Sequence, residues 1–231
     1  MLTTPQNPAA ALASVRERIT VAARTASRNP ASITLVGVAK SQPLERLRSA
    51  LDAGLADLGE NYLQEARTHF DALAGRTFRR HFIGALQTNK TRDVAQLFDW
   101  VHTVDRLRIA ERLSAQRPAA LPPLEVCIQV HVGDESSKSG VAPAGLGALA
   151  EAVTRLPQLR LRGLMCLPPE ETDPARQRRW FRELRRLAEG LNAAGHRLDV
   201  LSMGMSGDFE SAIAEGATHL RIGTAVFGAR G

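Results

Sequence analysis

The chain has 231 residues, of which 44% are hydrophobic, so it is long enough to bury a core and does not have the composition of a disordered protein. The 30 basic residues outnumber the 24 acidic ones, and they comprise 27 arginines and only three lysines, Lys40, Lys90 and Lys138. The two cysteines have no CxxC spacing, which argues against a zinc ribbon or a disulfide framework and favours a reducing compartment.

Targeting and membrane signals are missing from the sequence. No apolar run approaches the roughly 18 residues of a membrane-spanning helix, and the N-terminus lacks the basic start of a secretory signal. We therefore expect a soluble, cytoplasmic protein with no membrane partner.

The basic charge is spread along the chain and alternates with acidic residues, whereas nucleic-acid-binding proteins gather it on one face. The densest segment, 175–186 (ARQRRWFRELRR), carries Trp180, Phe181 and Leu184 near helical spacing. This pattern is typical of a solvated amphipathic helix, so we expect no nucleic-acid partner. An RNA-binding surface on this segment is the alternative.

Short apolar runs alternate with amphipathic stretches from residue 33 onwards. The pattern predicts strands at 33–39, 57–59, 81–84, 100–103, 124–132, 161–167, 198–203 and 219–222. It predicts helices at 8–26, 43–53, 61–73, 107–116, 146–155, 175–194 and 209–215. Eight alternations indicate an α/β fold, a (β/α)8 TIM barrel of one domain (1–231) with an extra N-terminal helix (1–30) before the barrel (31–231). A doubly wound open sheet is the alternative.

The binding residues of such a barrel lie at the carboxyl ends of the strands. Polar residues predicted at these ends are Lys40, Asn61, His81, Gln87, Lys138, Ser206, Arg221 and Thr224. We expect them to converge on one face. Residues 87–90 (QTNK) are expected to start a helix capped by Thr88 or Asn89, with Lys90 on the surface.

Lys40 ends the apolar run 33–39, so its amine emerges at the mouth of the predicted barrel. Partial burial lowers the pKa of a lysine, and a neutral amine can attack a carbonyl to form a Schiff base. A strand-end lysine that only reaches for water is an equal alternative on this evidence alone.

Two glycine-rich loops follow the seventh and eighth predicted strands. One contains Gly204-Met205-Ser206-Gly207, and the other contains Gly223 and Thr224 after Arg221. Backbone amides and hydroxyls in these two loops commonly bind phosphate in TIM barrels. The alternative is that Ser206 and Asp208 cap a helix and the glycines make turns.

A closed barrel places its last strand beside its first, so the predicted phosphate loops and Lys40 are neighbours. An aldehyde that carries a phosphate suits both, and pyridoxal 5'-phosphate (PLP) is the obvious candidate. Arg221 is then available for the pyridine nitrogen, which a permanently protonated guanidinium leaves unprotonated.

Seven separated motifs carry a resemblance to a known family. They are VAKSQP (38–43), GENYLQEA (59–66), HFIGALQTNK (81–90), DESSKSG (134–140), GLMCLPP (163–169), SMGMSGDFESAI (202–213) and RIGTAVFG (221–228). With these motifs the chain resembles the pyridoxal phosphate homeostasis proteins, the YggS or proline-synthetase co-transcribed family, over about residues 30–230.

The resemblance implies an alanine-racemase-like barrel that binds PLP in vitamin B6 homeostasis without established catalysis. It makes Lys40 the lysine of the aldimine and places Asn61 beside the ring. It assigns the phosphate to Ser206, Gly223 and Thr224 and the pyridine nitrogen to Arg221. Lys138 falls on a family lysine that could serve as a secondary site. Implied partners are PLP and the apo forms of PLP-dependent enzymes, with a monomer as the expected state.

Other chemistries fit the sequence less well. The six histidines lack the spacings of a metal site, so we predict no metal, and Ser206 is not in a GxSxG elbow. His81 and His219 are expected to be strand-end or packed residues. The remaining alternative is a PLP-dependent racemase, which needs a second acid or base. In racemases a tyrosine of an added domain supplies it, whereas this chain has the single tyrosine Tyr62. A carrier without catalysis is therefore the favoured hypothesis.

Overall fold

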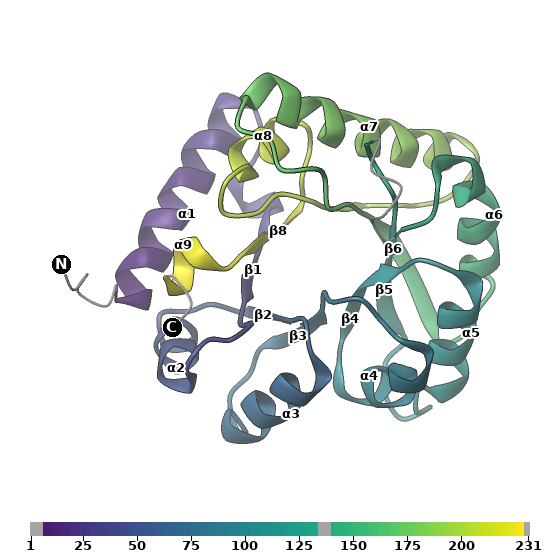
Figure 1. Ribbon diagram of the computed structural model, residues 1–231, viewed down its shortest axis with the longest axis horizontal. Coiled ribbons are helices and arrows are strands. Elements are labelled where there is room, and N and C mark those ends of the chain that lie inside the picture. Colours follow the sequence, from purple (N-terminus) through teal and green to yellow (C-terminus); the bar gives the residue numbers. More distant parts are fainter. Residues whose placement is uncertain (1–6, 134–139, 229–231) are drawn as a thin grey trace.

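The structure, a computed structural model, describes residues 7–133 and 140–228. Within these residues, eight parallel strands pair in chain order from β1 to β8 and close into a barrel that helices surround (Figure 1). β1 pairs with β2 on one side and with β8 on the other, so the sheet has no open edge. The closure confirms the predicted TIM barrel and excludes the open doubly wound sheet.

The strands lie on or near the predicted apolar runs. They are β1 (Thr34–Val38), β2 (Asp57–Glu60), β3 (Arg79–Phe82), β4 (Trp100–Val104), β5 (Leu124–Gln129), β6 (Leu159–Met165), β7 (Val200–Ser202) and β8 (His219–Ile222). The α-helices are α1 (Pro8–Thr25), α2 (Leu44–Asp52), α3 (Leu63–Ala72), α4 (Thr91–Leu97), α5 (Leu107–Gln116), α6 (Pro143–Thr154), α7 (Pro174–Ala193), α8 (Phe209–Ala214) and α9 (Thr224–Phe227). Two 3-10 helices are η1 (Pro30–Ser32) and η2 (Thr88–Lys90).

The predicted bounds of β3 are wrong by two residues at each end. The strand begins at Arg79, a charged residue that does not resemble a strand residue, because Arg79 aligns with Asp57 of β2. Arg79 Nε lies 2.7 Å from Asp57 Oδ1 across the two strands. As a consequence His81 lies within β3 and not at its carboxyl end.

The short helices also differ from the prediction. α4 and α9 have seven and four residues, too few to display a helical period in the sequence. The predicted cap by Thr88 or Asn89 is wrong, since both lie in η2 and α4 begins after Lys90 without a side-chain cap. The Thr91 hydroxyl instead donates to Thr88 O at 2.9 Å.

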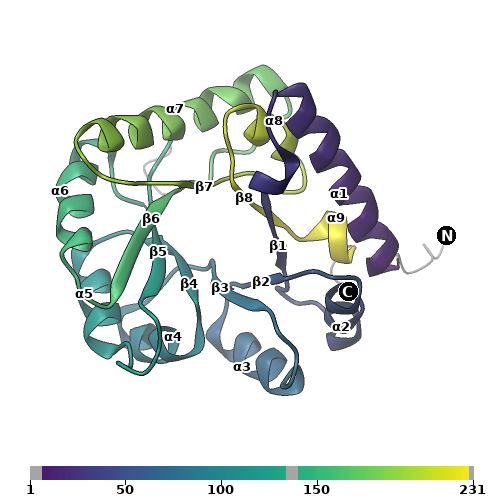
Figure 2. The ribbon, with the colours of Figure 1, turned by 180° about the vertical axis from the view of Figure 1, so that it is seen from behind.

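The N-terminal helix is predicted correctly to within one residue. Asn7 caps α1 by accepting a hydrogen bond from Ala9 N at 3.0 Å, and Pro8 occupies the first turn. The buried face of α1, which includes Leu12 and Val15, packs against α2, α8 and α9. Segments from the two ends of the described chain thus lie side by side (Figure 2).

Most buried apolar residues in the described part of the chain belong to one of two clusters. The larger one fills the space between the strands and the surrounding helices. The smaller one, inside the barrel, contains Trp100, Cys127, Met165 and Val200 from four successive strands. None of the described helices is long and apolar enough to cross a membrane.

Candidate functional site

A cavity of about 440 Å³ opens at the carboxyl ends of the strands. All six predicted site residues line it, namely Lys40, Asn61, Ser206, Arg221, Gly223 and Thr224. They come from the loops or ends of β1, β2, β7 and β8, which the closed barrel brings together. The structure therefore unites residues that are up to 184 positions apart in the printed sequence.

Lys40 is half-buried, and the backbone around it is held in place from both sides. The amide of Ala39 donates to Gly59 O at 2.9 Å, which ties the end of β1 to β2. Ser41, the next residue, has a φ of 54°, a left-handed conformation that is uncommon outside glycine. The Ser41 amide donates to Glu65 Oε2 of α3 at 2.9 Å, so α3 fixes this turn directly beside Lys40.

Arg221 is the buried charge of the site, with 3% of its surface exposed. Its two terminal nitrogens donate to the Ser202 hydroxyl at 2.7 Å and to Cys166 O at 2.8 Å. Both acceptors are neutral oxygens. Burial lowers the pKa of Arg221, but a guanidinium remains protonated in proteins. The site thus presents a fixed positive charge to whatever occupies the cavity.

The loops after β7 and β8 carry the hydroxyls of the site. Ser206 Oγ accepts a hydrogen bond from Ala225 N at 3.2 Å, so the first loop is joined to the start of α9. The alternative in which Ser206 caps the helix after the seventh strand is wrong, because α8 begins at Phe209 with Asp208 as its cap residue. Asp208 makes no side-chain cap bond and accepts instead from Met205 N at 2.5 Å.

Asn61 has an unsatisfied acceptor. Its Oδ1 atom is buried and has no hydrogen-bond partner among the described residues. The Asn61 backbone packs so closely on Gly84 that a Cβ at residue 84 would lie 2.0 Å from Asn61 O. Buried polar atoms are normally paired. An unpaired amide oxygen beside Lys40 and Arg221 therefore suits a cavity that receives a polar ligand.

Tyr62 is a neighbour of Lys40 that was not among the predicted site residues. Its ring centroid lies 5.2 Å from Lys40 Nζ, a cation–π distance, and the residue is 51% exposed. The position of Tyr62 directly after Asn61 was the available signal. Glu170 and Gln42 also line the cavity, but nothing in their local sequence indicates it.

The remaining predicted polar residues do not join the cavity. Gln87 and Lys90 line a neighbouring cavity of about 740 Å³ that shares Asn61 with the site, and Lys90 is exposed, as expected. His81 is fully buried inside the barrel, so its predicted place on the carboxyl face is wrong, whereas the expectation that His81 and His219 are strand-end or packed residues is confirmed. Lys138 lies outside the described residues.

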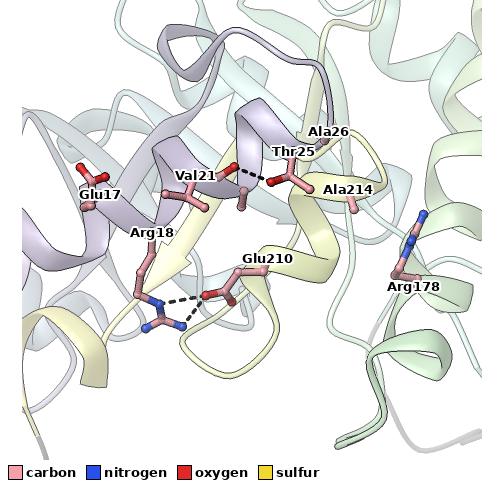
Figure 3. Close-up of a pocket in the computed structure, with 9 residues that line it drawn as sticks. Glu17, Arg18, Val21, Thr25, Ala26, Arg178, Glu210 and Ala214 are labelled. Carbon is pink, nitrogen blue, oxygen red and sulfur yellow. Dashed lines mark hydrogen bonds and ion pairs between the residues drawn. The ribbon is translucent and has the colours of Figure 1, made fainter.

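A further pocket, of about 560 Å³, lies on the outside of the barrel between α1 and α8 (Figure 3). Val21 and Ala22 form part of its apolar wall, and Arg18 bonds Glu210 across it at 2.5 Å. The pocket has no lysine in its lining. Elsewhere in the described part of the chain, no group of three His, Cys, Asp or Glu side chains is arranged to hold a metal ion.

Comparisons with known proteins identify the family. The chain matches the family model "Alanine racemase, N-terminal domain" over residues 11–231. It is 56% identical over 219 residues to the pyridoxal phosphate homeostasis protein of Pseudomonas aeruginosa, which covers 95% of this chain and 94% of that protein. It is 51% identical over 222 residues to the Escherichia coli K12 protein of the same name, with 95% of each chain covered. The chain belongs to the pyridoxal phosphate homeostasis protein family.

A solved member with its ligand supports the same assignment. PipY of Synechococcus elongatus, solved with PLP bound, superimposes with a TM-score of 0.84 at 35% identity, covering 96% of this chain and 100% of PipY. The family resemblance and the alanine-racemase-like barrel predicted from the seven motifs are thus confirmed.

Proposed function

We propose that this protein holds PLP on Lys40 and takes part in intracellular PLP homeostasis by buffering or delivering the cofactor. The observation that carries the proposal is one cavity in which a half-buried lysine, a buried arginine and two loop hydroxyls face the same space. This donor set fits an aldehyde that also bears a phosphate and a pyridine nitrogen. The PLP-bound state of PipY supports the same ligand class.

Each residue has a distinct part in this proposal. PLP would supply an aldehyde, and Lys40 would hold it by condensation of its amine with the aldehyde carbon, which forms a C=N bond and releases one water. Ser206 and Thr224 would donate their hydroxyls to the phosphate, and the lack of a side chain at Gly223 would let a backbone amide approach it. Asn61 offers its unpaired Oδ1 at the side of the ring.

Arg221 is the residue that favours a carrier over an enzyme. A guanidinium donates hydrogen bonds but does not release its proton, so a pyridine nitrogen held against Arg221 would stay unprotonated. An unprotonated ring withdraws electrons poorly and therefore stabilises a substrate carbanion poorly. The names of the curated relatives refer to homeostasis and support the same view.

The alternative is a racemase-type enzyme, and Tyr62 is the observation that favours it. Racemisation needs an acid or base on each face of the substrate, and Tyr62 is the phenol that lies beside Lys40. Incubation of the PLP-loaded protein with amino acids, followed by chiral chromatography, tests this alternative. We expect no turnover at an ordinary enzymatic rate of about 1 per second or more. If the wild type turned over at such a rate and Tyr62→Phe did not, the protein would be a racemase-type enzyme and the carrier proposal would be wrong.

The covalent link to Lys40 has a direct test. The purified protein is loaded with PLP, reduced with borohydride, dialysed and mapped by mass spectrometry. We expect the wild type and Lys90→Ala, which changes an exposed lysine, to retain one cofactor on the peptide that contains Lys40. Lys40→Ala should lose both the visible absorbance and this adduct. A full complement of reduced cofactor in Lys40→Ala would overturn the proposal, and an adduct on Lys138 would support a secondary site there.

The proposed function also implies a compartment, an oligomeric state and partners for the protein. We propose a cytoplasmic monomer of one domain whose partners are PLP and the apo forms of PLP-dependent enzymes. Cys127 and Cys166 are buried and free, and burial raises the pKa of each thiol to about 12, which suits a reducing compartment. Light scattering of the loaded protein, with and without an apoenzyme, measures both the oligomeric state and direct contact.

A further inference from the structure

A continuous line of buried polar side chains runs through the inside of the barrel and ends at Arg221. Asp57 Oδ1 lies 2.8 Å from His81 Nε2, and His81 Nδ1 lies 2.9 Å from His102 Nε2. His102 Nδ1 then lies 2.7 Å from the hydroxyl of Ser202, to which Arg221 donates at 2.7 Å. None of these five residues is more than 3% exposed. They come from β2, β3, β4, β7 and β8, so the line crosses the barrel from one side to the other.

Asp57 lies at the end of this line away from Arg221, and its charge state determines the direction of every hydrogen bond in the line. Asp57 is ionised, because hydrogen bonds from His81 and Arg79 outweigh the effect of burial and lower its pKa. An ionised carboxylate only accepts. Arg79 contacts both oxygens of Asp57, at 2.7 and 2.8 Å, and so holds the carboxylate in place. His81 must therefore donate its Nε2 proton to Asp57.

The next steps follow from the chemistry of a neutral imidazole, which has one donor and one acceptor. Burial lowers the pKa of His81 and of His102, so both rings are neutral. With its proton on Nε2, His81 accepts at Nδ1 and His102 must donate from Nε2. His102 then accepts at Nδ1, which leaves Ser202 to donate its hydroxyl proton there. The Ser202 oxygen is thereby directed to accept from Arg221, as observed.

We infer that Asp57, His81, His102 and Ser202 form a positioning relay that fixes the orientation of the Arg221 guanidinium toward the cofactor cavity. The four residues touch neither the cavity nor its ligand, since none of them lines it. They act by fixing the direction of the Ser202 hydroxyl, so that its oxygen accepts from one terminal nitrogen of Arg221 while Cys166 O accepts from the other. The inference rests on the proposed function for its effect on PLP, but not for the arrangement of protons inside the barrel.

The arrangement of protons is tested on the cofactor-free wild type, by nitrogen-15 NMR of the histidine rings at pH 7. We expect His81 and His102 both to be neutral with the proton on Nε2. A proton on Nδ1 of either ring, or a doubly protonated ring, would overturn the relay. This outcome does not depend on whether the protein binds PLP, so a failure of the relay and a failure of the proposed function are distinguishable.

The effect on the ligand is tested with variants at Ser202. Ser202→Ala should weaken PLP binding roughly three- to tenfold, the value of about one hydrogen bond. It should also move the midpoint of the pH titration of the bound cofactor's visible absorbance by about half a pH unit or more. Ser202→Thr, which keeps the hydroxyl, should restore the midpoint.

The matched control is Ser211→Ala. Ser211 is also a buried serine whose hydroxyl donates to a side chain, Gln177 Oε1 at 2.7 Å, but it lies on α8 outside the cavity. We expect it to leave the absorbance titration unchanged. If Ser202→Ala and Ser211→Ala titrate alike while the wild type binds PLP, Ser202 has only a packing role and the relay is wrong.

Discussion

Three histidines, His81, His102 and His219, are buried inside the barrel as neutral rings. Burial is the largest cause of a lowered pKa in each, and it lowers the pKa of His219 to about 3. Below the ordinary value of about 6.5, the unfolded chain binds protons that the folded chain excludes, so stability falls as the pH falls. His69 has the opposite effect on the pH dependence of stability, because its hydrogen bond to Glu60 raises its pKa in the folded chain.

The difference in histidine pKa between the folded and the unfolded chain predicts that the stability depends on pH and that single histidines account for this dependence. Between pH 6.5 and 5, the protonation of His219 in the unfolded chain should lower the free energy of unfolding by about 2 kcal/mol, because the pKa of His219 in the folded chain is about 3. His219→Asn should therefore flatten the dependence by about this amount, measured by urea unfolding at several pH values. His196→Asn, which changes a partly exposed histidine after α7, is the control and should keep the wild-type slope. Equal slopes in the wild type and His219→Asn would contradict the prediction.

At the scale of elements, the basic segment 175–186 holds α7 and α8 together. Glu215, the C-cap residue directly after α8, is 2% exposed and forms ion pairs with Arg178 and Arg182 at 2.8 Å and with Arg185 at 3.3 Å. Three of the arginines in the segment that was considered as an RNA-binding surface thus have an intramolecular partner. The pattern of the sequence was that of an amphipathic helix, and α7 indeed buries Phe181 and Leu184.

Removal of this shared carboxylate should loosen the α7–α8 contact. Glu215→Gln removes the anion that Arg178 and Arg182 share and leaves Arg185 with Glu189, and we expect a loss of about 1–3 kcal/mol in the free energy of unfolding. Glu151→Gln is the matched control, because within residues 7–133 and 140–228 Glu151 pairs only with Arg155, at the surface end of α6. It should change the stability by less than about 0.5 kcal/mol. A urea midpoint of Glu215→Gln equal to that of the control would show that the ion pairs of Glu215 contribute nothing to the stability.

At the scale of the whole molecule, closure of the barrel depends on close contact between β6 and β7. Gly163 pairs with Val200, and a Cβ at residue 163 would lie 1.8 Å from Val200 O. Backbone cannot yield to such a clash as a flexible side chain can. A glycine is therefore required for these two strands to approach.

Gly163→Ala should separate the two strands and lower the free energy of unfolding by about 3 kcal/mol or more, as overpacking does in rigid cores. Gly147→Ala is the control, since no atom lies within 4 Å of a Cβ there and the residue is in the middle of α6. It should stabilise the protein by about 0.5–1 kcal/mol. Similar thermal midpoints for the two variants would show that β6 and β7 tolerate a side chain.

Much of the fold could be predicted from the sequence because its signals are local. Most strands contain a short apolar run, and the longer helices have a periodic apolar face, so the alternation of a TIM barrel is visible without any contact information. Lys40, Arg221 and the two glycine-rich loops stand at or beside strand ends, where barrel sites lie. The sequence predicted that a helix starts at residues 87–90, where η2 and then α4 follow, but it did not predict α9 or the bounds of β3. α9 is too short to show a period, and β3 begins with the charged residues Arg79 and Arg80.

The sequence by itself determined the fold class, the family and the lysine to which a cofactor aldehyde is expected to bind. Only the tertiary structure decided which side chains support that site. Tyr62 lies against Lys40, and His81, which the sequence placed on the carboxyl face, belongs to a line that ends at Arg221. These contacts join residues from separate strands. Their distances are fixed by the register and closure of the barrel, which are properties of the sheet and are not encoded at any one position.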